Sequence, residues 1–137
     1  MVNQISIFAE NQKGAVRAIT RIFSDAGINI QSFVTNDSAE FGIIRMLVSD
    51  ADTAGTLLTA AGYQIKQTPV MAVGIPDEPG SLDRLLQKIE SANINIDYLY
   101  TSFDRDSASP VIAIHADDMD ELEEFLTASG FQCRHDV

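Results

Sequence analysis

The sequence is poor in cysteine, in basic residues and in long apolar stretches, and each shortage excludes a class of protein. Cys133 is the only cysteine among 137 residues, so neither an internal disulfide nor a thiolate metal cluster is possible. Twenty acidic residues against nine basic ones give a net charge of -11, which repels phosphate backbones and anionic lipid headgroups. We therefore expect neither nucleic acid nor a membrane as a partner, and we expect Cys133 to be a small apolar residue of the last strand.

Targeting and cofactor motifs are also missing. No run approaches the roughly 20 apolar residues of a spanning helix, and the opening MVNQISIF lacks the basic and apolar regions of a signal peptide. This pattern predicts a cytoplasmic protein. The phosphate-binding loop, the dinucleotide fingerprint, the zinc-protease motif and the nucleophile elbow are all absent from the sequence. We accordingly expect no cofactor and no catalytic residues.

Two patterns contain residue types that bind metals, but neither has the number or spacing of ligands that a metal site needs. His115 and Asp117 share one face of a predicted strand, but the chain has two histidines and a zinc site needs three or four ligands. We expect a solvated histidine on the sheet. The acidic run at 117–124 lacks the spacing of a calcium loop and precedes a predicted helix, whose dipole stabilises negative charge at that end.

An internal repeat is the strongest feature of the sequence. LTAAGYQ ends at position 64 and LTASGFQ ends at position 132. AGINI at 26–30 and ANINI at 92–96 match as well, so the copies align from strand to strand along the chain. Two extra residues in the second copy fall where a hairpin turn is expected, at 36–41 in the first copy and 102–109 in the second.

Each copy shows the same succession of hydrophobic periods. Residues alternate with a period of two around Ile5–Ala9 and Met71–Ile75, and a glycine-containing turn and a helical stripe follow. Gly27 and Asn93 close these helices and are the residue types that best adopt the left-handed conformation. The stripes are Val16, Ile19, Phe23 and Ala26, then Leu82, Leu85, Leu86, Ile89 and Ala92; the second helices carry Ala54, Leu57, Leu58 and Ala61, then Leu122, Phe125, Leu126 and Ser129, and end at Gly62 and Gly130.

This order predicts an α+β fold of two ferredoxin-like βαββαβ units, at 1–68 and 69–137. Each unit would have an antiparallel sheet with strand order 4-1-3-2 and two helices on one face. Residues 66–69 would form the linker, and Pro79 would stand in the first turn of its helix.

The stretch MAVGIPDEPGSLDRLLQKIESANINIDYL resembles the ACT domain, a small regulatory module that binds amino acids. The second copy has Asp77, Pro79, Gly80 and Asn95 at matching places, with Asn93 where glycine is usual. The first copy keeps Gly14 and the full AGINI but has Asn11 and Lys13 instead of Asp and Pro. The resemblance covers residues 3–136 and implies a stand-alone tandem ACT protein, a non-catalytic sensor that binds an amino acid at the seam between paired units and acts on a partner enzyme of amino acid metabolism.

The predicted ligand site follows from the chemistry of an amino acid. First-turn N–H groups of a helix have no intrahelical acceptor, so Gly14 with Ala15, and Gly80 with Ser81, would hold a carboxylate. Asp77 would attract the ammonium group, neutral Asn11 could serve either end of the ligand, and the asparagines of the two I-N-I motifs would complete the polar ring. The ligand-binding candidates are Asn11, Gly14, Ala15, Asn29, Ile30, Asp77, Pro79, Gly80, Ser81, Asn95 and Ile96.

Structural roles explain the same residue types. Asn11 and Asp77 are also ordinary helix-capping residues, the two I-N-I asparagines are ordinary turn residues, and the glycines are structural first. If both sites are vestigial, the protein is a dimerisation adaptor. A third alternative, an enzyme on this scaffold, would need an acid, base or nucleophile pair that the sequence does not show.

The linker limits how two such units can pair. Side-by-side pairing of the second strands within one chain would separate the linked strands by roughly 29 Å, while five residues span about 17 Å. We expect either exchanged last strands, with a turn through Thr68-Pro69, or edge pairing between chains. The outward residues Phe8, Ile43 and Leu47 make the open sheet face apolar and favour a homodimer.

Overall fold

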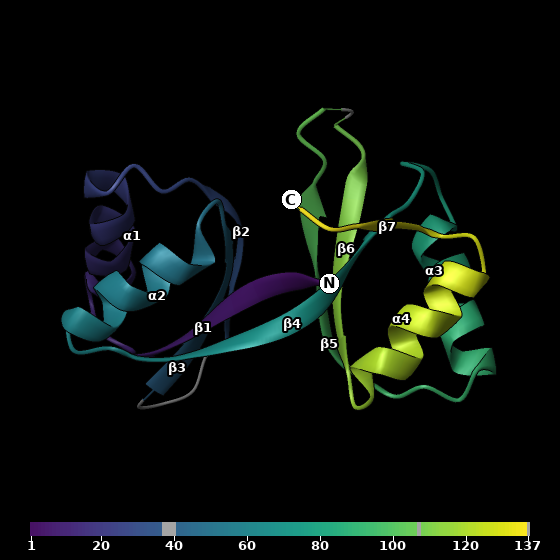
Figure 1. The fold of residues 1–137 in the computed structure, drawn as a ribbon, viewed down its shortest axis with the longest axis horizontal. Coiled ribbons are helices and arrows are strands. Elements are labelled where there is room, and N and C mark those ends of the chain that lie inside the picture. The colour runs from purple at the N-terminus through teal and green to yellow at the C-terminus, as the bar shows by residue number, and fades with distance from the viewer. Residues whose placement is uncertain (37–40, 107, 137) are drawn as a thin grey trace. The chain divides into compact units, whose positions relative to one another are not determined.

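The computed structural model describes residues 1–36, 41–106 and 108–136. The chain divides into two compact units. Asn3–Thr68 is called the first unit, and Pro69–Val137 together with Met1–Val2 is called the second unit. Figure 1 shows that each unit is a sheet with its two helices on the same side, as the repeat predicts. Of the two predicted hairpin turns, residues 37–40 and residue 107 lie outside the described part of the chain.

The element order repeats from one unit to the next. In the first it is β1 (Val2–Glu10), α1 (Ala15–Asp25), β2 (Ile30–Asn36), β3 (Phe41–Val48), α2 (Ala51–Ala60) and the start of β4 (Gln64–Gly74). In the second it is the rest of β4, α3 (Ser81–Ser91), β5 (Ile96–Phe103), β6 (Pro110–Ala116), α4 (Met119–Ala128) and β7 (Gln132–Arg134).

The predicted strand order 4-1-3-2 is confirmed in both units. The first unit has the order β4-β1-β3-β2, and the second has β7-β4-β6-β5. The pairs with a defined register are antiparallel, with Ile7 opposite Ile44 in the first unit and Val73 opposite Ile112 in the second. The edge strands β2 and β5 each begin with a register shift, after Ile30 and after Ile96.

The helix ends are built alike in the two units. Asp50 caps α2 by accepting a hydrogen bond from the Thr53 N–H at 3.1 Å, and Asp118 caps α4 by accepting one from the Glu121 N–H at 3.0 Å. The acidic run therefore lies at the start of a helix, as predicted. The predicted left-handed residues after α1 and α3 are confirmed, with φ of 71° at Gly27 and 58° at Asn93.

Each unit has its own core between sheet and helices. Ile5 and Ile7 from β1 pack with Ile19 and Phe23 from α1, and all four are fully buried. In the second unit, Met71 and Val73 pack with Leu85 and Ile89 in the same way. The period-two and helical stripes thus identified the residues that hold each unit together.

Four details differ from the sequence predictions. Val16 and Leu82, at matching places in the first turns of α1 and α3, are 41% and 39% exposed, because the buried stripe begins one turn later. Pro79 precedes the cap Gly80 and so lies outside the helix. The chain makes no turn at Thr68-Pro69, where β4 runs on as one strand. Leu47 is fully buried, so of the three outward residues Phe8 is the one that is clearly exposed, at 41%.

Candidate functional site

The start of α1 leaves backbone donors open in the first unit. Gly14 is the N-cap residue, with φ of 84°, a left-handed conformation that favours glycine. A Cβ there would meet nothing within 4 Å, so the backbone angle requires the glycine and crowding does not. The Ala15 N–H donates to Gln12 O at 3.2 Å, but the next first-turn N–H groups have no acceptor within the helix. This end of α1 is suited to an anionic group.

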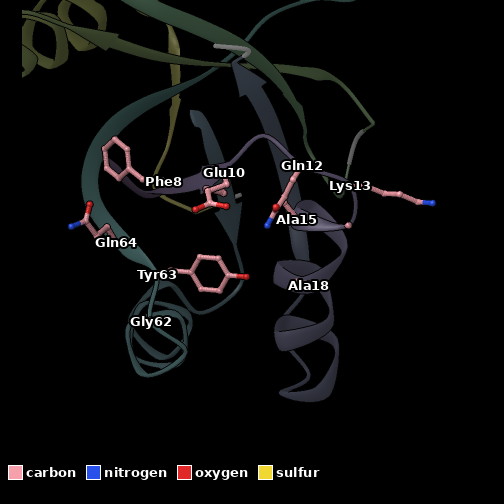
Figure 2. A pocket seen from close by; sticks show the side chains of 11 residues that line it. Phe8, Glu10, Gln12, Lys13, Ala15, Ala18, Gly62, Tyr63 and Gln64 are labelled. Carbon is pink, nitrogen blue, oxygen red and sulfur yellow. The ribbon is translucent and has the colours of Figure 1, made fainter. Parts of the chain in front are cut away.

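A hollow of about 460 Å³ lies beside this helix start. It is formed where the end of β1 and the turn after it meet the start of α1 and the turn between α2 and β4 (Figure 2). Its small lining residues Gly14, Ala15 and Ala18 leave the helix backbone accessible. The lining is Phe8, Ala9, Glu10, Gln12, Lys13, Gly14, Ala15, Ala18, Gly62, Tyr63 and Gln64.

The Glu10 carboxylate and the positive end of the α1 dipole both border this hollow. Figure 2 shows the Glu10 carboxylate and the Tyr63 ring reaching toward the space beside α1, while the Lys13 side chain extends away from it. An exposed carboxylate is a partner for an ammonium group, and the helix start is a partner for a carboxylate. The arrangement therefore offers one group for each end of an amino acid.

The second unit has an arginine beside the equivalent helix start, where Gly80 is the N-cap residue and, as at Gly14, no side chain caps the helix. The Arg84 guanidinium donates to Glu78 Oε1 at 2.9 Å and to Ser81 Oγ at 3.3 Å, and its Nη1 lies 3.1 Å from where a Cβ on Gly80 would be. The repeat places Ala18 where α3 has Arg84. A cationic side chain thus lies beside the start of α3, and the first unit has a small residue at the matching place.

The second unit nevertheless has a hollow, of about 500 Å³. Six of its lining residues match residues of the first hollow through the repeat: Gly74, Ile75 and Pro76 match Phe8, Ala9 and Glu10, and Gly130, Phe131 and Gln132 match Gly62, Tyr63 and Gln64. Ser109 and Arg134 complete it, whereas the start of α3 does not line it. The two hollows occupy the same place in the fold with different side chains.

The asparagines of the I-N-I motifs have structural hydrogen bonds. Asn29 N–H donates to Ser49 Oγ at 2.9 Å, and Asn29 O accepts from the Ser49 N–H at 2.9 Å. Asn95 O accepts from the Asp117 N–H at 3.2 Å, and its side-chain amide donates to Asp117 Oδ2 at 3.2 Å. Ser49 and Asp117 match through the repeat, so each asparagine joins the turn before its strand to the turn before the unit's second helix.

Within one unit these asparagines lie far from the glycine turn. Glu10, just before the turn, pairs with Phe41, whereas Ile30 pairs with Val48. Seven residue steps along β3 separate the two places, which is roughly 23 Å of strand. In the second unit Gly74 lies opposite Val111 and Ile96 opposite Ala116, so the last paired residue before the glycine turn is already five residue steps along β6 from the start of β5. The predicted polar ring therefore does not close within a unit.

The predicted site residues thus fall into separate groups. Gly14 and Ala15 line the first hollow, and Asn11 lies beside it, in a smaller depression of about 330 Å³ that Ala15 also lines. In the turn before α3, Asp77, Pro79 and Gly80 are exposed and Ser81 is buried. Asn29 and Ile30 begin β2, and Asn95 and Ile96 line an open depression at the start of β5.

The sequence interpretation missed Glu10, Tyr63 and Arg134. Tyr63 lies inside the repeated heptapeptide, which was used to find the helix end and not as a binding signal. Glu10 is the last residue of β1 and the one charged residue in the stretch 4–10. A single charge at the end of an otherwise uncharged strand was the feature that could have identified it. No local pattern marks Arg134, because its partner is thirty positions away (Asp104 to Arg134).

His115 and Cys133 have ordinary surroundings. His115 Nδ1 lies 2.9 Å from Asp97 Oδ2, and its ring stacks on Tyr98 with centroids 5.1 Å apart. Across the described residues, no three His, Cys, Asp or Glu side chains converge as metal ligands would. Cys133 lies in β7, as predicted, and burial raises the pKa of its thiol. None of the described helices combines the length and apolar character of a membrane span.

Comparison with known proteins agrees with this architecture. A family model described as "ACT domain pair" matches residues 1–132. The crystal structure of protein BT0572 from Bacteroides thetaiotaomicron is similar with a TM-score of 0.89 and 27% identity, over 97% of this chain and 91% of that one. The ligand-free regulatory subunit of aspartate kinase from Thermus thermophilus has a TM-score of 0.65 and 18% identity, over 93% and 89%. No curated protein sequence matches the chain.

Proposed function

Because the chain belongs to the ACT domain pair family, we propose that it is a non-catalytic regulatory protein that binds an amino acid in the hollow of its first unit. The observation that carries this proposal is the pairing of Glu10 with the open start of α1 across one hollow. The carboxylate receives the ligand's ammonium group, and the first-turn N–H groups receive its carboxylate. The Phe8 and Tyr63 rings leave an apolar wall for the side chain.

The predicted seam remains part of this proposal. Since the glycine turn and the I-N-I strand lie at opposite ends of one sheet, a ring containing both needs the turn of one ACT unit and the strand of another. We propose a homodimer as the source of further contacts, since Phe33 on edge strand β2 and Phe103 on edge strand β5 are 60% and 65% exposed. Light scattering would give about twice the 14.9 kDa chain mass, and a monomer would contradict the dimer.

A partner protein would receive the signal. The Thermus thermophilus structure is named as the regulatory subunit of an aspartate kinase, and we propose by analogy a partner enzyme of amino acid metabolism for this chain. Co-purification of the tagged protein, with and without the amino acid identified below, would reveal an enzyme that binds in a ligand-dependent way.

A thermal-shift screen of the twenty amino acids, followed by calorimetry, tests ligand binding. A ligand of the folded state raises the melting temperature, and one chemical class should do so by a few degrees. Glu10→Gln should weaken binding at least tenfold, since a charged hydrogen bond contributes about 1.5–3 kcal/mol. Ala18→Arg places a long side chain at a position that lines the hollow, and it should weaken binding by taking up space beside the helix start. Glu124→Gln, an exposed change on α4, is the matched charge control.

A flat response across all twenty amino acids, from a protein that melts cooperatively, would favour the adaptor alternative. Equal binding by wild type and Glu10→Gln would place the ligand elsewhere.

A further inference from the structure

The hollow of the second unit is lined by an arginine and by no carboxylate, whereas Glu10 lines the first. The repeat places Pro76 where the first hollow has Glu10, so no carboxylate is available there for an ammonium group. Arg134 lines the hollow instead. The matching residue of the first unit is Lys66, which does not line its hollow.

Arg134 is held in place across the sheet. It lies opposite Ala72 in the β4–β7 pair, and its Nε and Nη2 are 3.7 Å from where a Cβ on Gly74 would be, so the guanidinium extends over that glycine. Its Nη2 donates to Asp104 Oδ2 at 2.6 Å. Asp104 is itself fixed, because its other oxygen accepts the Asp106 N–H at 3.0 Å and its side chain is only 12% exposed.

The arginine retains donor capacity. A guanidinium has five N–H donors, and Asp104 engages it through Nη2. Among the described residues no group accepts the Nε–H, but this N–H is buried, so the donors that a ligand in the hollow would meet are those of the terminal Nη groups. About a third of the side chain, 36%, remains exposed. An oriented guanidinium with unused donors is a binding group for a carboxylate, which matches its fork geometry.

The other residues that line the hollow indicate the chemistry of the rest of the ligand. Ile75, Pro76 and Phe131 form an apolar wall, and Phe131 stands where the first hollow has Tyr63, without the hydroxyl. The Gln132 amide adds a polar group that can donate to an oxygen. These residues suit a short, partly apolar acid with a second oxygen near its carboxylate.

We propose that the second hollow binds a small carboxylic acid that lacks an ammonium group, of the 2-oxo acid class, through Arg134. The chain would then distinguish an amino acid from its deaminated counterpart in two equivalent hollows. This site is separate from the one proposed for amino acids and stands without it.

Calorimetry with matched pairs tests the proposal. The probes are pyruvate against alanine, 2-oxoglutarate against glutamate, and 4-methyl-2-oxopentanoate against leucine, with inorganic phosphate as a general anion. At least one 2-oxo acid should bind the wild type and Glu10→Gln alike. Arg134→Gln should weaken that binding at least tenfold, and Arg134→Lys, which keeps the charge without the fork, should weaken it several-fold. Arg105→Gln, an exposed arginine of the same turn as Asp104, should have no effect.

Two-dimensional amide NMR of the wild type locates the ligand independently of any variant. Shifts at Gly74, Gly130 and the Arg134 Nε–H on titration would support the proposal, and this measurement decides the matter if Arg134→Gln fails to fold. No 2-oxo acid binding, binding that Arg134→Gln leaves unchanged, equal binding of the amino acid partner at this hollow, or equally tight phosphate binding would each overturn it. Loss of amino acid binding in Glu10→Gln would test the first hollow only, so the two proposals fail separately.

Discussion

Asn95 and Asp117 are joined twice, by a backbone bond from the Asp117 N–H to Asn95 O and by a side-chain bond from Asn95 Nδ2 to Asp117 Oδ2, both at 3.2 Å. The pair connects the turn after α3 to the turn before α4. In the first unit Asn29 and Ser49 connect the same turns, but through the Asn29 backbone and the Ser49 hydroxyl. The backbone bond to the asparagine oxygen is common to both units, and the donor of the second bond differs: it is the backbone N–H of Asn29 in the first unit and the side-chain amide of Asn95 in the second.

This difference in donor predicts an order of stabilities among three alanine variants. Asn95→Ala removes a side-chain hydrogen bond and should lower the free energy of unfolding by about 1 kcal/mol, and Ser49→Ala should cost a similar amount. Asn29→Ala leaves its backbone bonds in place and should cost less than either. Urea unfolding of the three variants measures the order. If Asn29→Ala were the most damaging, the joint would depend on its side chain.

The residue after α3 carries backbone strain that its counterpart avoids. Asn93 has φ of 58°, and Gly27 has φ of 71° at the matching place. Left-handed backbone costs an L-residue about 1–2 kcal/mol, less for asparagine, and costs glycine nothing sterically. Asn93→Gly should therefore stabilise the protein by about 0.5–1 kcal/mol, and Gly27→Asn should destabilise it by a similar amount. Chemical denaturation of this reciprocal pair checks the sign, and two changes of the same sign would refute the explanation.

Asp50 makes the cap of α2 sensitive to acid. Hydrogen bonds from the Thr53 hydroxyl and the Thr53 N–H hold the pKa of this carboxyl below its ordinary value of 3.8. A lowered folded-state pKa gives a contribution to stability that is present above pH 3.8 and is lost as the pH falls through the folded value. Asparagine caps a helix without titrating. As the pH falls from 5 to 2, the wild type should therefore lose stability that Asp50→Asn keeps, and the melting temperature of Asp50→Asn relative to wild type should rise.

Asp52→Asn is the control for this measurement, since Asp52 lies in the first turn of the same helix and does not serve as its cap. Its difference from wild type should change less over the same range. A constant difference for Asp50→Asn would show that the Thr53 bonds do not favour the ionised carboxyl.

The repeat allowed the fold to be predicted from the sequence. The site could not be predicted in the same way, because it depends on contacts between residues that lie far apart in the sequence. Ile5, Ile7, Ile19 and Phe23 were found by periodicity because burial against a sheet imposes a spacing on the chain. Gly27 and Asn93 were found because one backbone angle limits the residue types that fit. Both kinds of inference use neighbours along the chain.

Contacts between side chains from different parts of the fold could not be predicted from neighbours along the chain. Arg84 lies beside Gly80 because one helix turn separates the two residues, and the sequence analysis did not predict a guanidinium beside that glycine. The glycine turn and the I-N-I strand appeared as one site because both are marked by motifs, yet antiparallel registers place them at opposite ends of a sheet. The distance between two motifs depends on how the strands are ordered and paired, and the motifs themselves do not contain that information.

The longer turn between β5 and β6 has a consequence for the second hollow. It contains Asp104, the residue that orients Arg134, and the two added residues leave all four strands of the second unit in the order of the first. A surface turn accepts added residues without altering the core. In this protein the turn whose length distinguishes the two copies also carries the carboxylate that pairs with Arg134, so a difference in loop length comes with a difference in the charged groups beside one hollow.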